Sequence, residues 1–226
     1  MSYDENSTER YQKTIKICDQ ELRVANNPII YDIGGYGALL EVIRENYCHT
    51  NLVDISSADL NTKNLNIKDN SSDIIFLCEV IEHLYDPDQV IRECYRCLKD
   101  EGILVLTTPN LCSWFNRILL ALGYFPLNMD ISCQLRYTGK RDILSKVPFN
   151  VGIFNPLFDV HIRLYTVDTL RILLEEWGFE ITDILGYTVS NSTHYKINNL
   201  LGIVNKIFSK FPALSQGLII KAKAIK

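Results

Sequence analysis

Two carboxylates and two imidazoles are the side chains in this sequence that are best suited to chemistry. Glu79, Glu82 and His83 form the pattern Glu-x-x-Glu-His, and His161 follows at a distance. Carboxylate oxygens and imidazole nitrogens together suit a divalent cation such as Mg²⁺ or Mn²⁺. Such a cation could bind an acceptor oxygen and lower its pKa. All four residues are therefore candidate metal ligands.

The same residues have other interpretations that the sequence leaves open. Glu82 and His83 could anchor a loop and cap the helix that follows, and His161 could be a simple hydrogen-bond donor. Without a metal, His83 or His161 could act as a general base, because imidazole titrates near neutral pH. Glu82, His83 and His161 are therefore also the candidate catalytic residues.

A glycine-rich turn near the N-terminus is a second candidate site. Asp32 lies in a short apolar run that ends in a turn with three glycines, and Asp54 ends the next apolar run. Glycines let the backbone approach a ligand closely. An acid at the end of the second strand can accept both hydroxyls of a ribose. The pattern fits a dinucleotide, an adenosyl cofactor or a purely structural turn.

The elements that must position these residues alternate along the chain. Hydrophobic periodicity and turn residues predict helices over 8–25, 38–47, 87–98, 166–177 and 197–211, and strands over 29–33, 51–55, 73–78, 103–108, 179–189 and 218–224. This order predicts an α/β fold with a doubly wound, mostly parallel sheet and helices on both faces. We expect one domain over residues 1–226, with an N-terminal helix within 1–27.

Residues 110–160 differ from the rest, because they hold most of the prolines and aromatics. An insertion of this length is usually functional, so we expect a lid over the acceptor. Its aromatics could form the walls of an acceptor site, and its cations could meet a phosphate or carboxylate. Alternatively, the aromatics could pack a small core of the lid, and the cations could simply be exposed to solvent. These residues are Trp114, Phe115, Tyr124, Phe125, Tyr137, Phe149, Phe154 and Phe158, with Arg136, Lys140 and Arg141. The helix over 197–211 should pack on the sheet, with membrane contact as the alternative.

A series of short motifs after the third strand gives the sequence a family resemblance. Glu79-Val-Ile-Glu-His-Leu84 is followed by Arg96-Cys-Leu-Lys99, Gly102 and Thr107-Thr-Pro-Asn110, and later by His161-Ile-Arg-Leu-Tyr-Thr166. This series resembles the branch of class I S-adenosylmethionine-dependent methyltransferases with an EVLEH-type motif and a strand ending in TPN. The resemblance covers roughly residues 28–190 and implies a Rossmann-like methyltransferase fold.

The resemblance also implies which residues bind S-adenosylmethionine. The glycines would pass under its methionine and ribose, and Asp32 would lie near the methionine amine. Asp54 would hold the ribose hydroxyls, and Asp59 would meet the adenine amino group. Cys78 and Glu79 would lie near the sulfonium. The full set is Asp32, Gly34, Gly35, Gly37, Asp54, Asp59, Cys78 and Glu79.

The sequence departs from the family pattern in two places. The glycine run lacks one residue of DxGxGxG or has Ala38 in place of the last glycine, and Asp54 and Asp59 are unusually close. The four candidate metal ligands resemble those of metal-dependent O-methyltransferases, such as the small-RNA 2′-O-methyltransferases and the ubiquinone-pathway enzymes.

Composition limits the classes of protein and partner. The net charge of −4 argues against general binding to nucleic acid. The N-terminus is polar and acidic, unlike a signal peptide, and no window of 18 apolar residues predicts a transmembrane segment. Seven cysteines, an odd number, lie mostly in apolar segments. Reduced thiols and a cytoplasmic location are therefore expected.

These observations favour an S-adenosylmethionine-dependent methyltransferase that acts on oxygen or nitrogen of a small molecule, glycan or lipid precursor. The alternatives are a methyltransferase-like protein that binds a nucleoside without catalysis, and an RNA 2′-O-methyltransferase, which the acidic charge disfavours. The sequence does not specify the oligomeric state.

Overall fold

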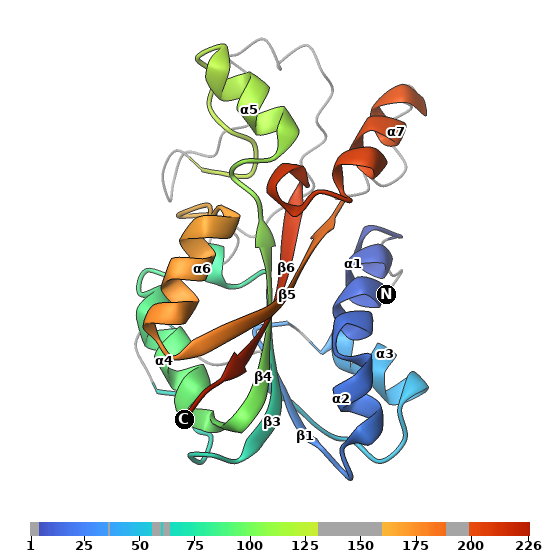
Figure 1. Ribbon diagram of the computed structural model, residues 1–226, viewed down its shortest axis with the longest axis vertical. Helices are drawn as coiled ribbons and strands as arrows, with labels where there is room; N and C mark the ends of the chain where they lie inside the picture. Colours follow the sequence, from blue (N-terminus) through green and yellow to red (C-terminus); the bar gives the residue numbers. More distant parts are fainter. Residues whose placement is uncertain (1–4, 36, 56–59, 61–63, 131–159, 189–198) are drawn as a thin grey trace.

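The computed structural model describes residues 5–35, 37–55, 60, 64–130, 160–188 and 199–226. Their centre is a six-stranded sheet in the order β2-β1-β3-β4-β6-β5 (Figure 1). The strands β2, β1, β3 and β4 run parallel to one another, and β6 is antiparallel to both β4 and β5. The predicted doubly wound, mostly parallel sheet is therefore confirmed.

The strands are β1 (Ile29–Ile33), β2 (Asn51–Ile55), β3 (Ser72–Cys78), β4 (Leu98–Pro109), β5 (Phe179–Tyr187) and β6 (Gly217–Ala224). The α-helices are α1 (Glu5–Ile17), α2 (Asp19–Val24), α3 (Ala38–Asn46), α4 (Pro87–Cys97), α5 (Trp114–Ala121), α6 (Val167–Glu176) and α7 (Asn199–Phe208). Two short 3-10 helices are η1 (Ile81–His83) and η3 (Pro212–Leu214).

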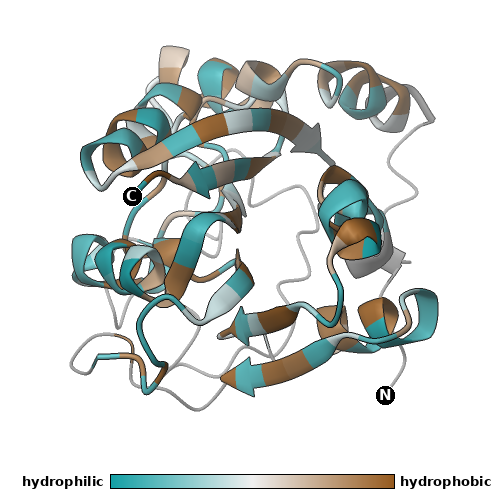
Figure 2. Cartoon of the chain, turned by 60° about the horizontal axis from the view of Figure 1, so that its bottom comes forward, coloured by the Kyte–Doolittle hydropathy of each residue, from teal (hydrophilic) through white to brown (hydrophobic). Residues whose placement is uncertain are grey.

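Helices cover both faces of the sheet, as Figure 1 shows. One face packs against α1, α2 and α3, and its core includes Ile30, Phe76 and Val105. The other face packs against α4 and α6, and its core includes Leu77 and Leu104. Burying each such side chain contributes about 1.5–3 kcal/mol. Apolar and hydrophilic residues alternate along the elements in Figure 2, as expected where one face meets the core.

Local signals explain the starts of two helices beside the site. The side chain of Asp86 accepts a hydrogen bond from the Gln89 backbone N–H at 3.1 Å, and Pro87 occupies the first turn of α4. The helix α6 begins with a reciprocal capping box between Thr166 and Thr169. These caps fix the ends of the two helices that cover the same face of the sheet.

The observed elements differ from the predicted ones mainly at their ends. The helix predicted over 8–25 is two helices, because the backbone of Cys18 leaves helical geometry at φ −115° and ψ 18°. Its thiol donates to the backbone oxygens of Thr14 and Ile15 inside the core. The strand predicted over 103–108 begins at Leu98, where it pairs with Ser72.

Two further expectations concern the lid and the membrane. Helix α5 occupies the first part of the predicted lid, but residues 131–159 lie outside the described residues, so the lid stays a prediction. The single-domain assignment also stays a prediction. Among the described helices, none has both the length and the apolar character needed to cross a membrane.

Candidate active site

The candidate residues gather at the carboxyl ends of the parallel strands. The chain runs from β1 outward to β2 and then returns to β3 on the other side of β1, so the direction of winding reverses beside β1. Ligands of doubly wound sheets bind at such a point. Asp32 on β1 is in register with Asp54 on β2 and Phe76 on β3. Adjacent strands therefore bring the predicted cofactor residues together.

The glycine turn leaves no room for side chains between itself and the two acids. A Cβ atom on Gly35 would lie 2.3 Å from Oδ1 of Asp32, and one on Gly37 would lie 3.0 Å from Oδ2 of Asp54. Gly37 also has φ +72°, a left-handed conformation that favours glycine, where it precedes α3. Gly34 begins the turn, and its N–H donates to the backbone oxygen of Ile55 at 3.2 Å.

Asp32 is a fully buried acid on β1. Its side chain is 0% exposed, and no described residue forms a hydrogen bond to either of its carboxylate oxygens. Burial raises the pKa of Asp32 to about 7, and the charge of Asp54 adds to the rise. The Gly37 amide acts in the opposite direction but does not reach hydrogen-bond geometry. Such a carboxylate needs a cationic donor from a ligand to be satisfied.

Arg10, on α1, brings a positive charge to the same region. Its guanidinium forms an ion pair with Oε2 of Glu79 at 3.2 Å. Burial lowers the pKa of Arg10, but Glu79, with smaller contributions from Tyr187, Cys78 and Tyr11, more than offsets this, and the pKa is raised. The Nε atom is buried and lacks a hydrogen-bond partner among the described residues. The site thus holds an unsatisfied donor as well as the unsatisfied acceptor at Asp32.

Glu79 is held by three side chains at once. Its Oε1 accepts hydrogen bonds from the hydroxyls of Thr107 at 2.9 Å and Tyr187 at 2.8 Å, in addition to the Arg10 ion pair. The backbone of Glu79 has φ +56°, which is uncommon for a residue other than glycine. This strained turn directs the side chain away from the next candidate, Glu82.

Two consecutive threonines of β4 separate the two glutamates. Thr107 donates to Glu79, whereas Thr108 donates to Oε2 of Glu82 at 3.0 Å. Neighbouring side chains on a strand point to opposite faces of the sheet. Glu79 therefore belongs to the face covered by α1, and Glu82 to the face covered by α4 and α6.

Glu82 is the second buried acid with an unsatisfied oxygen. It is 0% exposed, and its Oε1 has no hydrogen-bond partner among the described residues. Burial, followed by the nearby charge of Glu79, raises the pKa of Glu82 well above its usual value. The Nε2 atom of His83 lies 4.0 Å from this Oε1. That distance is too long for a hydrogen bond, but a shared cation could bridge two such atoms.

His83 and His161 complete a cluster with Glu82. Their ring centroids are 4.7 Å apart, and one donor atom from each of the three residues lies within 4.8 Å of the others. The Nδ1 atom of His83 meets the Val160 backbone oxygen at 2.9 Å, and that of His161 meets the Asn128 backbone oxygen at 2.6 Å. A carbonyl oxygen only accepts, so Nδ1 carries the proton in both rings, and the lone pair is at Nε2.

The structure thus brings three of the four predicted metal ligands together. The fourth, Glu79, was expected to point the same way because it is three residues before Glu82. Its left-handed backbone and its partners direct it to the other face instead. Asp54 lies at the end of β2, exposed, and Cys78 is buried at the end of β3. Asp59 lies outside the described residues.

Sequence reasoning missed Arg10, Tyr187 and the two threonines. Arg10 and Tyr187 are far from the motifs in the chain, and only the packing of α1 and β5 brings them to Glu79. The Thr107-Thr108 pair was part of the motif series. Two polar side chains at the end of an apolar strand were the signal that could have identified this pair as hydrogen-bond donors to Glu79 and Glu82.

Comparisons with known proteins agree with this placement. A family described as "Methyltransferase domain" matches residues 30–184. A probable S-adenosylmethionine-dependent methyltransferase of Mycolicibacterium smegmatis is 29% identical over 134 residues, which are 59% of this chain and 38% of that protein. A ubiquinone biosynthesis O-methyltransferase of Pseudomonas aeruginosa is 28% identical over 129 residues, which are 56% of this chain and 45% of that enzyme. The chain therefore spans less than half of the length of both relatives.

Solved structures share the fold at low sequence identity. An S-adenosylmethionine-dependent methyltransferase from Archaeoglobus fulgidus has a TM-score of 0.53 and 17% identity, over 95% of this chain and 94% of that one. The [4+2]-cyclase SpnF has a TM-score of 0.52 and 15% identity, over 95% of this chain and 81% of its own. Since a cyclase is among the neighbours, the reaction must be argued from the site.

Proposed function

Because this chain belongs to the family of S-adenosylmethionine-dependent methyltransferases, we propose that it methylates a hydroxyl oxygen with the help of a divalent cation. The acceptor would be a small molecule, a glycan or a lipid precursor. The observation that carries the proposal is the cluster of Glu82, His83 and His161, in which a buried carboxylate oxygen that has no hydrogen-bond partner among the described residues lies beside two oriented imidazoles.

The residues at the glycine turn fit S-adenosylmethionine. Its methionine end carries one cationic and one anionic group, and the site offers one unsatisfied partner for each. Asp32 would accept from the ammonium, and the Nε–H of Arg10 would donate to the carboxylate. Asp54 would hold the ribose hydroxyls beyond Gly37. Burial raises the pKa of Asp32 to about 7. A bound ammonium would favour the ionised form of Asp32 and so lower this pKa.

The cluster of Glu82, His83 and His161 fits a divalent cation such as Mn²⁺ or Mg²⁺. Both imidazoles donate Nδ1–H to a backbone carbonyl, an arrangement that metal-binding histidines usually show, because it fixes the ring and leaves Nε2 to the metal. Thr108 fixes Oε2 of Glu82 and so leaves Oε1 for the cation. Three protein ligands would leave positions for the acceptor and water.

Each part of the site has a defined task in the reaction. S-adenosylmethionine supplies a methyl group already activated on a sulfonium, so the protein has mainly to align the acceptor. Such alignment can lower the activation free energy by about 7–11 kcal/mol. A cation held by Glu82, His83 and His161 would lower the pKa of an acceptor hydroxyl. If no cation binds, Nε2 of His83 or His161 is the base that remains.

Two isosteric variants test the proposal, because the structure separates the two glutamates. Mn²⁺ alone and S-adenosylhomocysteine alone are titrated by calorimetry into the wild type, Glu82→Gln and Glu79→Gln. Glu82→Gln should lose at least tenfold in Mn²⁺ affinity and keep its affinity for S-adenosylhomocysteine. Glu79→Gln should lose affinity for S-adenosylhomocysteine and keep its affinity for Mn²⁺, because it removes the ion pair that holds Arg10.

An acceptor screen completes the test. Hydroxylated small molecules, glycans and lipid precursors are offered with labelled S-adenosylmethionine, with and without a chelator. Transfer that stops on chelation and returns with Mn²⁺ supports the proposal. A wild type that does not bind Mn²⁺, or transfer that persists in excess chelator, contradicts the metal and favours a histidine base. A chain that binds S-adenosylhomocysteine but never transfers a methyl group would instead be a binding protein.

A further inference from the structure

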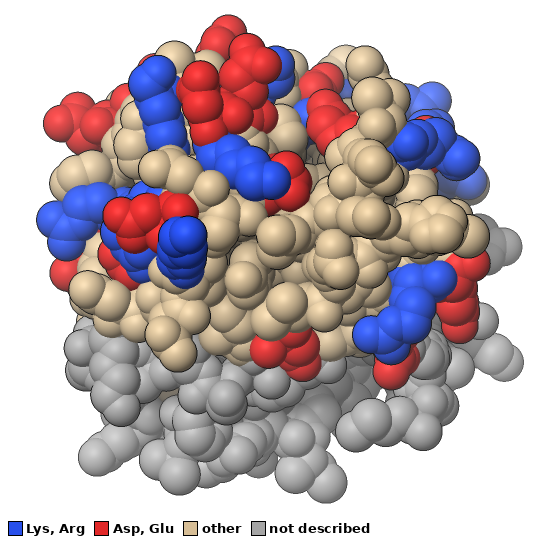
Figure 3. Space-filling model, turned by 90° about the horizontal axis from the view of Figure 1, so that it is seen from below, with Lys and Arg blue, Asp and Glu red and all other residues tan. Residues whose placement is uncertain are grey.

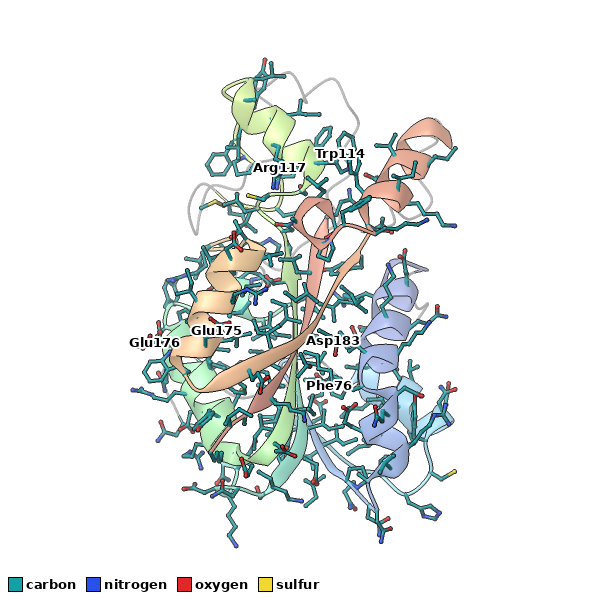
Figure 4. The ribbon with its side chains drawn as sticks, viewed as in Figure 1. Phe76, Trp114, Arg117, Glu175, Glu176 and Asp183 are labelled. Atoms are coloured by element: carbon teal, nitrogen blue, oxygen red, sulfur yellow. The ribbon has the colours of Figure 1, made fainter. Side chains whose placement is uncertain are left out.

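Helices α5 and α7 both lie beyond the carboxyl end of the sheet (Figure 1), and Trp114 of α5 contacts α7. The indole of Trp114 stacks on Phe208 with ring centroids 5.5 Å apart, and its Nε1–H donates to the side chain of Asn205 at 2.8 Å. Figure 4 shows Trp114 between the two helices. Trp114 therefore links α5 to α7, and the exposed residues of the two helices lie at the same end of the molecule.

The exposed residues of these two helices are unusually apolar. Twelve large hydrophobic residues are exposed in the described part of the chain, and six of them lie on α5, α7 or the turns that follow. We call these six the apolar cap: Ile118, Leu120, Leu122, Ile203, Ile207 and Phe211. Their exposed fractions range from 48% to 66%. An exposed cluster of this kind usually marks an interaction surface.

The two helices that carry the apolar cap have only basic charged residues in their own sequences. The sequences of α5 and α7 contain no Asp or Glu, and none occurs between Ile184 and Lys226. Lys206 on α7 and Lys210 in the turn that follows it are exposed, as are Ile203 and Ile207. Figure 3, which shows the opposite end of the molecule, has acidic and basic residues intermixed. Glu9 of α1 lies close enough to Lys206 for the lysine to lower the pKa of Glu9, so one acid borders the cap although α5 and α7 contain none.

We propose that the apolar cap binds the surface of a membrane that contains anionic lipids. On α7, Ile203, Lys206 and Ile207 follow the spacing of one helix face, and Lys210 lies in the turn directly after the helix, so apolar and cationic side chains alternate there. This pattern suits a helix in the interface plane, with isoleucines among the acyl chains and lysines at lipid phosphates. A second copy fits less well, because a twofold contact would set a lysine-bearing face against itself.

Membrane binding would also bear on the acceptor. The apolar cap lies beyond the strand ends that carry the candidate active site, so a bound molecule would turn that end toward the bilayer (Figure 1). This consequence rests on the proposed function, and it selects a lipid precursor among the acceptors. The membrane binding itself does not rest on it, because it depends only on the surface of α5 and α7.

Vesicle flotation tests the proposal on the full chain. Vesicles of phosphatidylcholine, with or without phosphatidylglycerol, are mixed with the wild type and with the double variant Ile203→Gln/Ile207→Gln. The matched control is Val24→Gln/Ile172→Gln, which changes residues that are 78% and 67% exposed on α2 and α6. The wild type and the control should float with phosphatidylglycerol vesicles, and the cap variant should bind at least about tenfold more weakly.

Two further measurements make the outcome decisive. Lys206→Gln/Lys210→Gln should reduce the preference for phosphatidylglycerol, and high salt should do the same to the wild type. Affinity for S-adenosylhomocysteine, measured in parallel, should be unchanged in every variant and so reports that each is folded. The proposal is overturned if the wild type does not float, or if cap and control variants bind equally. It is also overturned if the wild type is a dimer that the cap variant dissociates.

Discussion

Asp32→Asn should make the cofactor-free chain more stable while it weakens cofactor binding. The pKa of Asp32 is about 7 in the fold against an ordinary value of 3.8. Each pH unit between two such values corresponds to about 1.4 kcal/mol, so keeping Asp32 ionised in the fold costs about 4 kcal/mol. Asparagine removes this cost but buries an amide without partners, which costs about 1–3 kcal/mol. The net gain expected above neutral pH is about 1–3 kcal/mol.

The pH dependence of this gain follows from the sign of the shift. The folded chain holds the proton of Asp32 more tightly than the unfolded chain, because burial raises the pKa of Asp32 to about 7. The free energy of unfolding of the wild type therefore falls as the pH rises from about 4 to about 7 and is lowest above that. At about pH 5 the advantage of Asp32→Asn should be smaller than at pH 8 by about 2–3 kcal/mol.

Two assays test these expectations for Asp32. Urea denaturation at both pH values, without cofactor, gives the free energies of unfolding of the wild type and Asp32→Asn. Calorimetry with S-adenosylhomocysteine should show a loss of about 1.5–3 kcal/mol in the variant, as expected for a charge-assisted hydrogen bond. A variant less stable than the wild type at pH 8, or one with unchanged affinity, would refute the role of Asp32.

The other predictions concern residues that act on the two buried acids. Thr108→Val removes the donor to Oε2 of Glu82 and should weaken Mn²⁺ binding by about tenfold in calorimetry. It should also lower the free energy of unfolding by about 1–3 kcal/mol, because it leaves a buried acceptor without its donor. Arg10→Lys keeps the charge beside Glu79 but loses the Nε–H donor. It should therefore weaken S-adenosylhomocysteine binding by about tenfold and leave Mn²⁺ binding unchanged. Equal losses for both ligands in either variant would contradict the separation of the two sites.

Much of the fold could be predicted because its signals are local. Apolar runs and turn residues gave the order of strands and helices, since each depends on spacing within a few residues. The break at Cys18 could not be predicted, because its neighbours keep a helical pattern and only the bonds of its thiol to Thr14 and Ile15 reveal the change. The early start of β4 at Leu98 likewise depends on its pairing with Ser72.

The candidate site was predictable in its residue types but less so in its geometry. The glycine turn and the Glu-x-x-Glu-His motif are visible in the sequence, so Asp32, Glu82 and His83 could be named. The orientation of the imidazoles could not, because it depends on backbone oxygens, such as that of Val160, whose positions follow from the fold. Arg10 was invisible for a similar reason, since its helix is distant from β3 in the chain.

The spacing of Glu79 and Glu82 shows why a motif alone cannot assign ligands. Residues three apart share a face only if the backbone between them is helical, but the 3-10 helix begins at Ile81 and Glu79 is left-handed. What assigns each acid is its donor on β4, and Thr107 and Thr108 must point to opposite faces. The end of one strand thus divides the site into a half with Glu79 and a half with Glu82, His83 and His161. A substitution in either half can change one affinity without the other, and for this reason paired variants can test the two roles separately.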